Sequence, residues 1–496
     1  MYMSLIRVNH LTFAYEGSYD NIFEDVSFQI DTDWKLGFVG RNGRGKTTFL
    51  NLLRGKYDCG GAISAKADFI YFPFDIQNTE QMTIEIIDQI LPTYEYWQLS
   101  RELNSLEVSD EVLYRPFSSL SFGEQTKVLL SVLFLDENCF PLIDEPTNHL
   151  DLHGREVVSR YLASKRGFIL ISHDRSFLDS CTDHILSINK TNIEVQKGNF
   201  SSYLQNKERR DNFELAENEK LSRSIKALET AAGRTARWSD KVEKTKNGTR
   251  NSGVKADKGH IGAQAAKMMK RSKSVQKRRN AAIEEKAGLL KNIERADALK
   301  IHPLTFHTDP LVLGEEISIS FDGVQTALGP FSFSVNSGER IALRGKNGCG
   351  KSSLLKLILG LPMNYTGSLY RGSGLKISYV SQDTSFLQGS LTDFARQRNI
   401  DETLFLTILR KLDFERIQFT KPMEDFSGGQ KKKVLIAASL CEEAHLYLWD
   451  EPLNFIDVLS RMQIENLLRT YNPSMIFVEH DRAFCDNIAT RIIELE

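Results

Sequence analysis

The hydrophobic and polar positions of this 496-residue chain define two kinds of region. Residues 4–30 alternate between apolar and polar side chains around turn signals, a pattern that predicts antiparallel strands. Short apolar runs at 36–39 and 140–143 are bounded by polar residues and predict buried strands. A helix is expected over about Gln125–Leu135, and strands that alternate with helices favour an α/β fold.

The pattern between residues 201 and 300 is helical. Two apolar series recur at helical or heptad spacing: Leu221, Ile225, Leu228 and Ala232, and then Met268, Val275, Ala282 and Leu289. No proline occurs between Pro146 and Pro303, so long helices are permitted. We predict two antiparallel helices joined by a polar, glycine-containing loop over 233–262.

Charge is distributed unevenly between these regions. The segment 201–300 carries 25 Lys and Arg against 13 Asp and Glu, although the whole chain has a net charge of only −2. An excess of positive charge on a protruding hairpin is what binding to a phosphate backbone requires, and Trp238 can stack on a base or on a small planar ligand. The alternative is a solvated linker with ordinary coiled-coil charges. RNA binding is the preferred interpretation.

A glycine-rich loop follows the apolar run at 36–39. Its sequence, GRNGRGKTT, matches G-x-x-x-x-G-K-[ST], in which backbone N–H groups surround phosphate oxygens, the lysine reaches the outer phosphates and the hydroxyl can ligate Mg2+. The predicted nucleotide-binding residues of this loop are Gly40, Asn42, Gly43, Gly45, Lys46, Thr47 and Thr48.

Two carboxylates follow the apolar run at 140–143. Asp144, at the end of a buried strand, can orient Mg2+, and Glu145 can position or deprotonate an attacking water. A pair of acids at a helix N-terminus is the simpler explanation of such a dipeptide. The neighbouring residues Ser121, Gly123 and Gln125 upstream, and the PTNHLD segment downstream, favour nucleotide hydrolysis instead.

The second half of the chain repeats these elements at an offset of 305 to 307 residues, which indicates a duplicated domain. The equivalent residues are Gly345, Asn347, Gly348, Gly350, Lys351, Ser352 and Ser353 in the glycine-rich loop, Ser427, Gly428, Gly429 and Gln430 in an FSGGQ segment, and Asp450, Glu451 and His480. We predict that both copies bind ATP and that at least one hydrolyses it.

These segments resemble the Walker A, signature, Walker B and D-loop motifs of ATP-binding cassette (ABC) proteins, and EPTNHLD resembles the ABC-F branch most closely. The resemblance implies two cassettes packed head to tail, with each ATP between the Walker A loop of one and the signature of the other. Site one combines the first Walker A loop with the second signature, and site two the reverse. The resemblance also implies catalytic roles for Glu145, Glu451, His173 and His480, adenine stacking by Tyr15 or Phe321, and ATP contacts from Ser121, Gly123 and Gln125.

The family also places a glutamine near the metal and the lytic water. In the second half this residue is Gln382, and the implied Mg2+ ligands are Thr47, Asp144, Ser352, Gln382 and Asp450. In the first half Phe74 takes the position when the strands are aligned, whereas Gln77 takes it when residues are counted from Lys46, and the sequence leaves both open. Phe122 replaces the first signature glycine and should hinder approach of the backbone to phosphate, so site two is expected to turn over slowly.

The resemblance to ABC-F proteins extends over essentially the whole chain, and segments such as RPFSSLS and FELAENEK are similar to the Lsa group of antibiotic-resistance proteins. It implies a bacterial 70S ribosome as partner, with the linker in the E site near 23S rRNA and P-site tRNA. It further implies protection against lincosamides, streptogramin A and pleuromutilins. The candidate RNA-contacting residues at the linker tip are Trp238, Lys241, Lys244 and Arg250.

Composition is consistent with a cytoplasmic protein. The six cysteines lack CxxC spacing and favour free thiols, and the N-terminus, where Met1 and Met3 can both serve as starts, shows no secretory signal. No apolar window is long enough to span a membrane. Two other functions stay open: a housekeeping ABC-F translation factor that acts on stalled ribosomes, and the ATPase subunit of a drug exporter.

We therefore expect an α/β protein with two ABC-type P-loop ATPase domains in tandem, at 1–204 and 303–496, joined by a basic α-helical hairpin linker at 205–302. The expected activity is ATP hydrolysis with ATP and Mg2+ as cofactors. No membrane and no obligate protein partner are expected.

Overall fold

The computed structural model of the chain describes residues 4–16, 21–136, 138–148, 150–189, 192–245, 258–288, 299–321 and 325–495. It divides into two compact units, of which the first contains residues 1–188, 193–201 and 296–496 and the second contains 189–192 and 202–295. The first unit holds both cassettes and the second holds the helical linker. The limits 1–204, 205–302 and 303–496 stay predictions.

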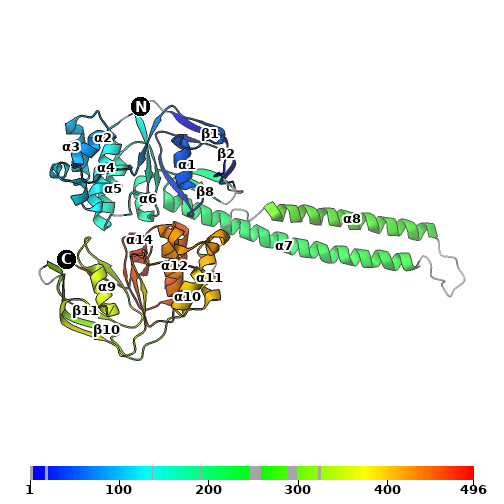
Figure 1. Cartoon of the computed structure of the whole chain (residues 1–496). Coiled ribbons are helices and arrows are strands. Elements are labelled where there is room, and N and C mark those ends of the chain that lie inside the picture. The colour runs from blue at the N-terminus through cyan, green and yellow to red at the C-terminus, as the bar shows by residue number, and fades with distance from the viewer. Residues whose placement is uncertain are drawn as a thin grey trace. The chain divides into compact units, whose positions relative to one another are not determined.

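Cassette one contains two sheets (Figure 1). The antiparallel sheet has the order β2-β1-β4, with strands β1 (Leu5–Phe13), β2 (Phe23–Asp31) and β4 (Gly60–Ser64). The larger sheet has the order β5-β6-β7-β3-β8-β9, with strands β3 (Lys35–Gly40), β5 (Asp68–Phe72), β6 (Cys139–Asp144), β7 (Phe168–Ile171), β8 (His184–Ile188) and β9 (Ile193–Lys197). The pairing of β1 with β2 confirms the antiparallel strands predicted for residues 4–30.

The helices of cassette one cover the parallel strands. They are α1 (Lys46–Leu53), α2 (Thr83–Ile90), α3 (Tyr96–Ser105), α4 (Phe122–Leu133), α5 (Leu152–Ser164) and α6 (Arg175–Cys181), with 3₁₀ turns at Asp110–Tyr114 and Phe117–Ser119. Phe49 of α1 packs with Phe38, Leu142 and Ile169 of the sheet in one core. Because helices cover these strands, the strands are continuous apolar runs, as parallel sheets require.

Cassette two repeats this arrangement. Its sheets have the orders β11-β10-β13 and β14-β15-β16-β12-β17, with strands β10 (Val312–Phe321), β11 (Gln325–Val335), β12 (Arg340–Arg344), β13 (Tyr365–Arg371), β14 (Ile377–Val380), β15 (Leu446–Asp450), β16 (Met475–Val478) and β17 (Arg491–Glu494). Its helices are α9 (Lys351–Leu359), α10 (Leu391–Gln397), α11 (Glu402–Lys411), α12 (Gly428–Cys441), α13 (Val458–Tyr471) and α14 (Arg482–Ile488), with 3₁₀ turns at Arg416–Thr420 and Met423–Asp425.

The strand order positions the chemistry. In cassette one β6, β7 and β3 are neighbours and parallel, so the segments that leave their carboxyl ends meet at one edge of the sheet. These segments carry Asp144, His173 and the Walker A loop. The order β15-β16-β12 does the same for Asp450, His480 and the second Walker A loop.

The linker consists of two long helices that run in opposite directions, α7 (Phe200–Thr245) and α8 (Lys258–Gly288), as Figure 1 shows. The predicted polar loop over 233–262 was too long, because 233–245 and 258–262 are helical. For 233–245 the physical reason is that this stretch lacks proline and contains Ala, Arg, Lys and Glu, whose helix propensity outweighs the isolated Gly233. Residues 246–257 lie outside the described part of the chain.

Two candidate ATP sites

The Walker A loop of cassette one turns through left-handed glycines into helix α1. Gly45 has φ 87°, and a Cβ atom there would lie 2.4 Å from Ile22 Cγ2, so only glycine fits. Lys46 Nζ donates to the carbonyl oxygens of Gly40 at 2.8 Å and Arg41 at 3.1 Å. Burial lowers the pKa of Lys46. The Walker A loop therefore surrounds the Lys46 ammonium group with backbone carbonyl groups, as a phosphate-binding loop does.

The second Walker A loop has the same geometry. Gly350 has φ 92° at the start of α9, and Lys351 Nζ donates to the carbonyl oxygens of Gly345 and Lys346, both at 2.8 Å. The duplication read from the sequence thus extends to individual hydrogen bonds.

The two Walker B aspartates are both candidates for Mg2+. Thr47 Oγ1 donates to Asp144 Oδ2 at 2.8 Å, and the hydroxyl of Tyr71 on β5 donates to the same oxygen at 3.1 Å. Asp450 is buried, and within the described residues neither of its carboxylate oxygens accepts a hydrogen bond. Burial raises the pKa of both aspartates.

Carboxylate oxygens are the ligands that a hard cation such as Mg2+ prefers. Burying a carboxylate without a hydrogen-bond partner costs free energy, and a bound cation would reduce that cost. The described residues contain no group of three or more His, Cys, Asp or Glu side chains that could hold a metal. Mg2+ would therefore be held by Thr47 and Asp144, or by Ser352 and Asp450, with nucleotide and water oxygens completing its ligands. Its chemistry there would be to neutralise phosphate charge.

Both candidate catalytic glutamates adopt a backbone conformation that side chains rarely take. Glu145 has φ 52° and Glu451 has φ 46°. The backbone N–H of each donates to the neighbouring strand, Glu145 to Ile171 O at 2.9 Å and Glu451 to Val478 O at 3.0 Å. A left-handed non-glycine residue is strained by roughly 1–3 kcal/mol and persists where surrounding structure fixes it, most often at functional sites. No sequence signal predicted this strain.

The partners of the two glutamates differ. His173 Nε2 lies 3.3 Å from Glu145 Oε1. Burial, followed by the charge of Asp144, raises the pKa of Glu145 to about 8. Burial therefore disfavours the ionised form of the Glu145 carboxyl in site one.

Glu451 is held by three side chains. Gln382 Nε2 donates to its Oε2 at 2.9 Å, Asn454 Nδ2 donates to the same oxygen at 2.7 Å, and His480 Nε2 lies 3.4 Å from its Oε1. Burial alone would raise the pKa of Glu451, but His480, Lys432 and Gln382 together lower it. Site two therefore holds its glutamate as a carboxylate.

Strand register decides the position left open in cassette one. Phe72 on β5 pairs with Ile143, and Val380 on β14 pairs with Trp449, and each partner immediately precedes the Walker B aspartate. Two residues beyond these strand ends lie Phe74 and Gln382. Phe74 therefore occupies the glutamine position in cassette one, and the exposed Gln77 does not.

Lys432 is a candidate site residue that the sequence analysis missed. It is buried on α12, and its Nζ donates to Ser381 O at 2.9 Å, beside the Glu451 site. The available signal was the run Lys431–Lys433 inside an otherwise apolar helix. Thr126 takes its place in cassette one when the signature serines are aligned, so cassette one lacks this charge.

The signature helices begin with matching caps. Ser121 Oγ accepts from Glu124 N at 3.2 Å while Glu124 Oε2 accepts from Ser121 N at 2.8 Å. Ser427 forms the same reciprocal pair with Gln430. The helix therefore starts at Phe122, and the predicted start at about Gln125 was three residues too late.

This capping pattern corrects the predicted first signature. Glu124, not Gln125, occupies the position of Gln430. The Gln125 side chain instead donates to the carbonyl oxygens of Phe117 at 2.9 Å and Leu120 at 3.2 Å, which holds the preceding loop. The reason for the error is that a glutamine was matched by residue type, whereas the helix start fixes the register.

Site one is closed by cassette two. Asn42 Nδ2 donates to the carbonyl oxygen of Phe455 at 2.8 Å. Phe455 has φ 63°, and a Cβ atom on Gly429 would lie 2.5 Å from its carbonyl oxygen. The Walker A loop of cassette one therefore meets the D-loop (residues 453–457) and the signature of cassette two, in the predicted head-to-tail sense.

Site two contains a cavity. A cavity of about 540 Å³ is lined by residues of both cassettes: Asp151, Leu152, His153, Arg344, Gly345, Lys346, Glu479, His480, Arg482, Cys485, Glu494 and Leu495. For Ser121 and Gly123 the described part of the chain shows no polar contact with the second Walker A loop.

Other predicted residues lie near these sites or outside the described part of the chain. The Tyr15 hydroxyl is 2.8 Å from Thr48 Oγ1 on α1, and the ring is 42% exposed, so adenine stacking stays a prediction. The side chains of Trp238, Lys241, Lys244 and Phe321, and the whole of His149 and Arg250, lie outside the described residues.

Two Walker A loops, two Walker B carboxylate pairs and two signature helices in one chain define a tandem cassette ATPase. The family described as ABC transporter matches residues 23–148 and 328–454, just over half of the chain, and the chain belongs to this family. Within it the chain is an ABC-F ATPase, with two ATP-binding and hydrolysing domains.

Curated relatives match almost the whole chain. The ribosome protection protein VmlR of Bacillus subtilis is 28% identical over 95% of this chain and 84% of its own length. The ATP-binding protein Uup of Escherichia coli is 26% identical over 98% of this chain and 80% of its own. ABC transporter F family member 2 of Arabidopsis thaliana is 24% identical over 99% of this chain and 76% of its own.

Solved structures share the fold. The complex of archaeal ribosomal stalk protein aP1 and archaeal ribosome recycling factor aABCE1 gives a TM-score of 0.63 at 18% identity, and covers 98% of this chain and 87% of that one. No helix among the described residues has both the length and the apolar character needed to cross a membrane.

Proposed function

We propose that the chain binds the bacterial 70S ribosome and protects it from peptidyl-transferase-centre antibiotics, namely lincosamides, streptogramin A and pleuromutilins. The observation that carries the proposal is a basic helical hairpin joined to two ATP sites, in a chain similar throughout to a ribosome protection protein. ATP and Mg2+ bring the cassettes together, and hydrolysis releases the factor. The partner is rRNA with P-site tRNA, and no further protein is required.

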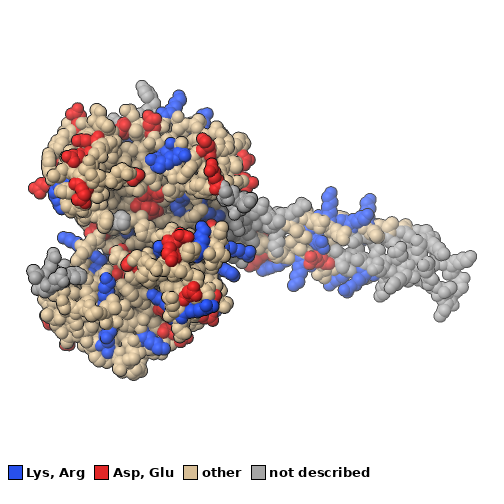
Figure 2. Space-filling model, in the orientation of Figure 1, with Lys and Arg blue, Asp and Glu red and all other residues tan. Residues whose placement is uncertain are grey.

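The charge of the hairpin supports RNA as the partner. The sequence contains no Asp or Glu between Lys258 and Ile283. The exposed basic side chains of the described helices are Arg209, Arg210, Lys220, Arg223, Lys226, Arg234 and Arg237 on α7, and Lys267, Lys270, Arg271, Lys273, Lys277 and Arg278 on α8. Figure 2 shows Lys and Arg side chains projecting from the described part of the linker. Such a surface favours a polyanion, with affinity that falls steeply as salt rises.

The first experiment is ribosome co-sedimentation of the Glu145→Gln, Glu451→Gln double variant, with ATP against ADP, over a salt series. We expect binding that requires ATP and weakens with salt. The Lys270→Glu, Lys273→Glu variant should bind less, and its matched control, Lys376→Glu on cassette two, should bind normally. Absence of ATP-dependent binding would contradict the proposal.

Antibiotic protection is tested separately, by expression in a susceptible bacterium and by translation extracts with lincomycin or tiamulin. We expect resistance in the wild type and its loss in Trp238→Ala at equal expression, since the tip would act through base stacking. Retained resistance in Trp238→Ala would remove the stacking role but leave ribosome binding standing. Trp238, Lys241, Lys244 and Arg250 together form the proposed tip.

A second function, a housekeeping factor for stalled ribosomes, is supported by the similarity to Uup. Transfer of resistance to a susceptible host distinguishes the two, because a housekeeping factor would bind ribosomes in the same assay without conferring resistance. An exporter ATPase would instead require a membrane partner, and a basic hairpin between its cassettes has no evident use in transport.

A further inference from the structure

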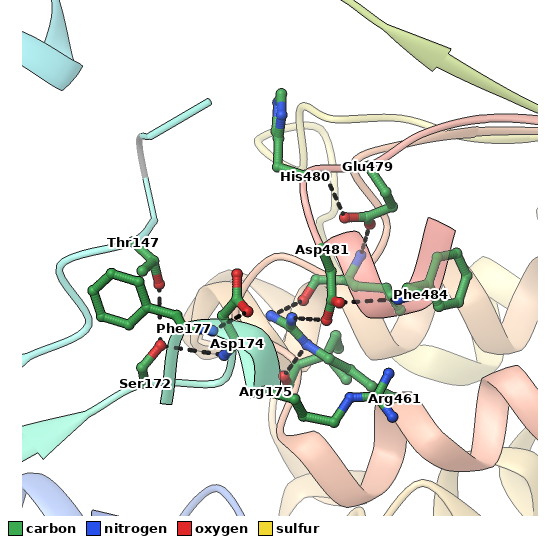
Figure 3. Close-up of polar contacts among 12 residues, drawn as sticks. Thr147, Ser172, Asp174, Arg175, Phe177, Arg461, Glu479, His480, Asp481 and Phe484 are labelled. Atoms are coloured by element: carbon green, nitrogen blue, oxygen red, sulfur yellow. Dashed lines mark hydrogen bonds and ion pairs between the residues drawn. The ribbon is translucent and has the colours of Figure 1, made fainter. Parts of the chain in front are cut away.

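The backbone segment that closes site one is fastened by a buried glutamate to the catalytic histidine of site two. Glu479 precedes His480 and is 6% exposed. Its Oε1 accepts the N–H of Leu453 at 2.7 Å, and its Oε2 accepts the N–H of His480 at 3.2 Å (Figure 3). One carboxylate thus joins the D-loop of cassette two to the residue that contacts Glu451.

Arg461 on α13 holds the same two segments. It donates to the carbonyl oxygens of Leu453 and Ile456, each at 2.9 Å, and to Asp481 Oδ2 at 3.0 Å. Figure 3 shows its guanidinium beside Asp481. Because a guanidinium is planar and rigid, it fixes the relative positions of its acceptors. The D-loop and the Glu479–Asp481 segment should therefore move as one piece.

The D-loop end of this linked segment lies in site one. Phe455, between the two anchored residues Leu453 and Ile456, accepts the hydrogen bond from Asn42 of the first Walker A loop. A shift of His480 in site two therefore displaces the backbone that meets the nucleotide loop of site one.

The equivalent link in cassette one is weaker. Thr147 and Ser172 replace Leu453 and Glu479, and their hydroxyl oxygens lie 3.2 Å apart (Figure 3). The Thr147–Ser172 pair supplies one hydrogen bond between freely rotating hydroxyls, whereas the Glu479 carboxyl accepts two N–H groups. Loss of Glu479 would by contrast leave two buried N–H groups unpaired. Arg155 in cassette one repeats part of the Arg461 link, to Leu150 O at 3.1 Å and to Asp174 Oδ2 at 2.8 Å, so the difference between the two connections rests on Glu479.

We propose that Glu479 is a positioning residue that transmits the position of His480 in site two to the D-loop that closes site one. This inference concerns ATP hydrolysis alone and does not depend on the ribosome.

The test measures turnover at one site at a time. In a Glu451→Gln background hydrolysis reports site one. There, Glu479→Ser should lower the turnover of site one by roughly tenfold to a hundredfold, because small misplacements of catalytic groups have effects of this size. Leu453→Thr added to Glu479→Ser recreates the weaker pair of cassette one and should recover part of the loss. Glu479→Gln, which keeps the shape and one acceptor oxygen, should have an intermediate effect and serves where Glu479→Ser folds poorly.

The matched control is Ser172→Ala in a Glu145→Gln background, which reports site two and should change its turnover less than about twofold, since only neutral hydrogen bonds to Thr147 and Asp174 are lost. Unchanged site-one turnover in both Glu479 variants would overturn the proposal. A loss that Leu453→Thr leaves uncorrected would also overturn it, because a merely structural role for Glu479 gives that result.

Discussion

In site one the Walker A loop touches the opposite cassette, whereas in site two the catalytic glutamate has the better set of partners. Asn42 binds Phe455 across site one, whereas the residue of site two that is equivalent to Phe455, His149, lies outside the described residues, and described residues of both cassettes line a cavity there. The Glu451 carboxylate is contacted by Gln382, Asn454 and His480. The Glu145 carboxylate is contacted by His173. The described residues therefore show a contact between the cassettes at site one and the fuller set of carboxylate partners at site two.

The comparison shows how duplicated sites diverge without losing a motif. Phe74 in place of glutamine and Thr126 in place of Lys432 alter the surroundings of Glu145 without changing it. The two glutamates consequently differ in pKa, raised to about 8 at Glu145 and lowered at Glu451. The two copies differ in the residues around the glutamate, because no other side chain can replace the reacting carboxylate.

The largest expected effect comes from the two glutamates themselves. Glu145→Gln with Glu451→Gln should lower ATP hydrolysis by at least about a hundredfold, the usual contribution of a general base, while ATP binding persists. Of the single variants, Glu451→Gln should remove more of the steady-state rate, because Glu451 is held as a carboxylate. Phosphate release measures this. Phe122 in the facing signature predicts the opposite order, so a larger loss in Glu145→Gln would show that closure outweighs carboxylate positioning.

Two arginines at the contact between the cassettes should contribute differently to the stability of the protein. Arg175 pairs with the buried Glu465, whereas Arg482 lies 3.3 Å from the exposed Glu156. Arg175→Ala should lower the free energy of unfolding by about 3 kcal/mol, because it leaves a buried carboxylate unpaired. Arg482→Ala should change it by less than about 0.5 kcal/mol. Equal effects in denaturant unfolding would mean that the Arg175 pair is solvated.

The pH dependence of stability should distinguish cassette two from cassette one. Burial raises the pKa of Glu479 to about 7, from an ordinary value near 4.5. Its contribution to stability is therefore complete below about pH 4.5 and is lost as pH rises through about 7, because the unfolded chain releases the proton first.

Between pH 5.5 and pH 8.5 the nucleotide-free wild type should thus lose about 2 kcal/mol more than Glu479→Gln does. Thermal unfolding at the two pH values measures the difference. Ser172→Ala in cassette one is the control and should track the wild type. Parallel pH profiles for the wild type and Glu479→Gln would show that Glu479 ionises normally in the folded protein.

The smallest expected effect is an exchange at the glutamine position. Gln382→Phe should lower site-two turnover about tenfold, since Glu451 loses one of its hydrogen bonds. Phe74→Gln should raise site-one turnover a few-fold by supplying that bond to Glu145. Each is measured with the other site silenced by its Glu→Gln variant. No gain in Phe74→Gln would mean that the missing glutamine does not limit site one.

Much of the fold was predictable because its signals are local. The alternation over residues 4–30, the apolar runs before Gly40 and Asp144, and the repeat itself predicted the strands and loops that the structure contains. The hairpin was predictable from its proline-free heptads. Its loop was overestimated, since a polar, glycine-containing segment is helical when strong helix formers surround the glycine.

The candidate sites were predictable only in part. Residue types identified Lys46, Asp144 and His173, but matching by type misplaced Gln125, which the capping pattern replaces with Glu124. The left-handed backbone of Glu145 and Glu451 leaves no trace in composition or spacing, because any strain there is imposed by strands distant in sequence.

The sequence by itself determined that two cassettes exist and which side chains carry their chemistry, because phosphate loops and strand-end carboxylates are specified by neighbouring residues. Only the tertiary structure decided that Phe74 stands at the glutamine position, that Asn42 meets Phe455, and that Glu479 joins the D-loop to His480. These relations depend on strand register and on contacts across hundreds of residues. Local sequence patterns do not encode such distances, since they follow from packing of the whole chain.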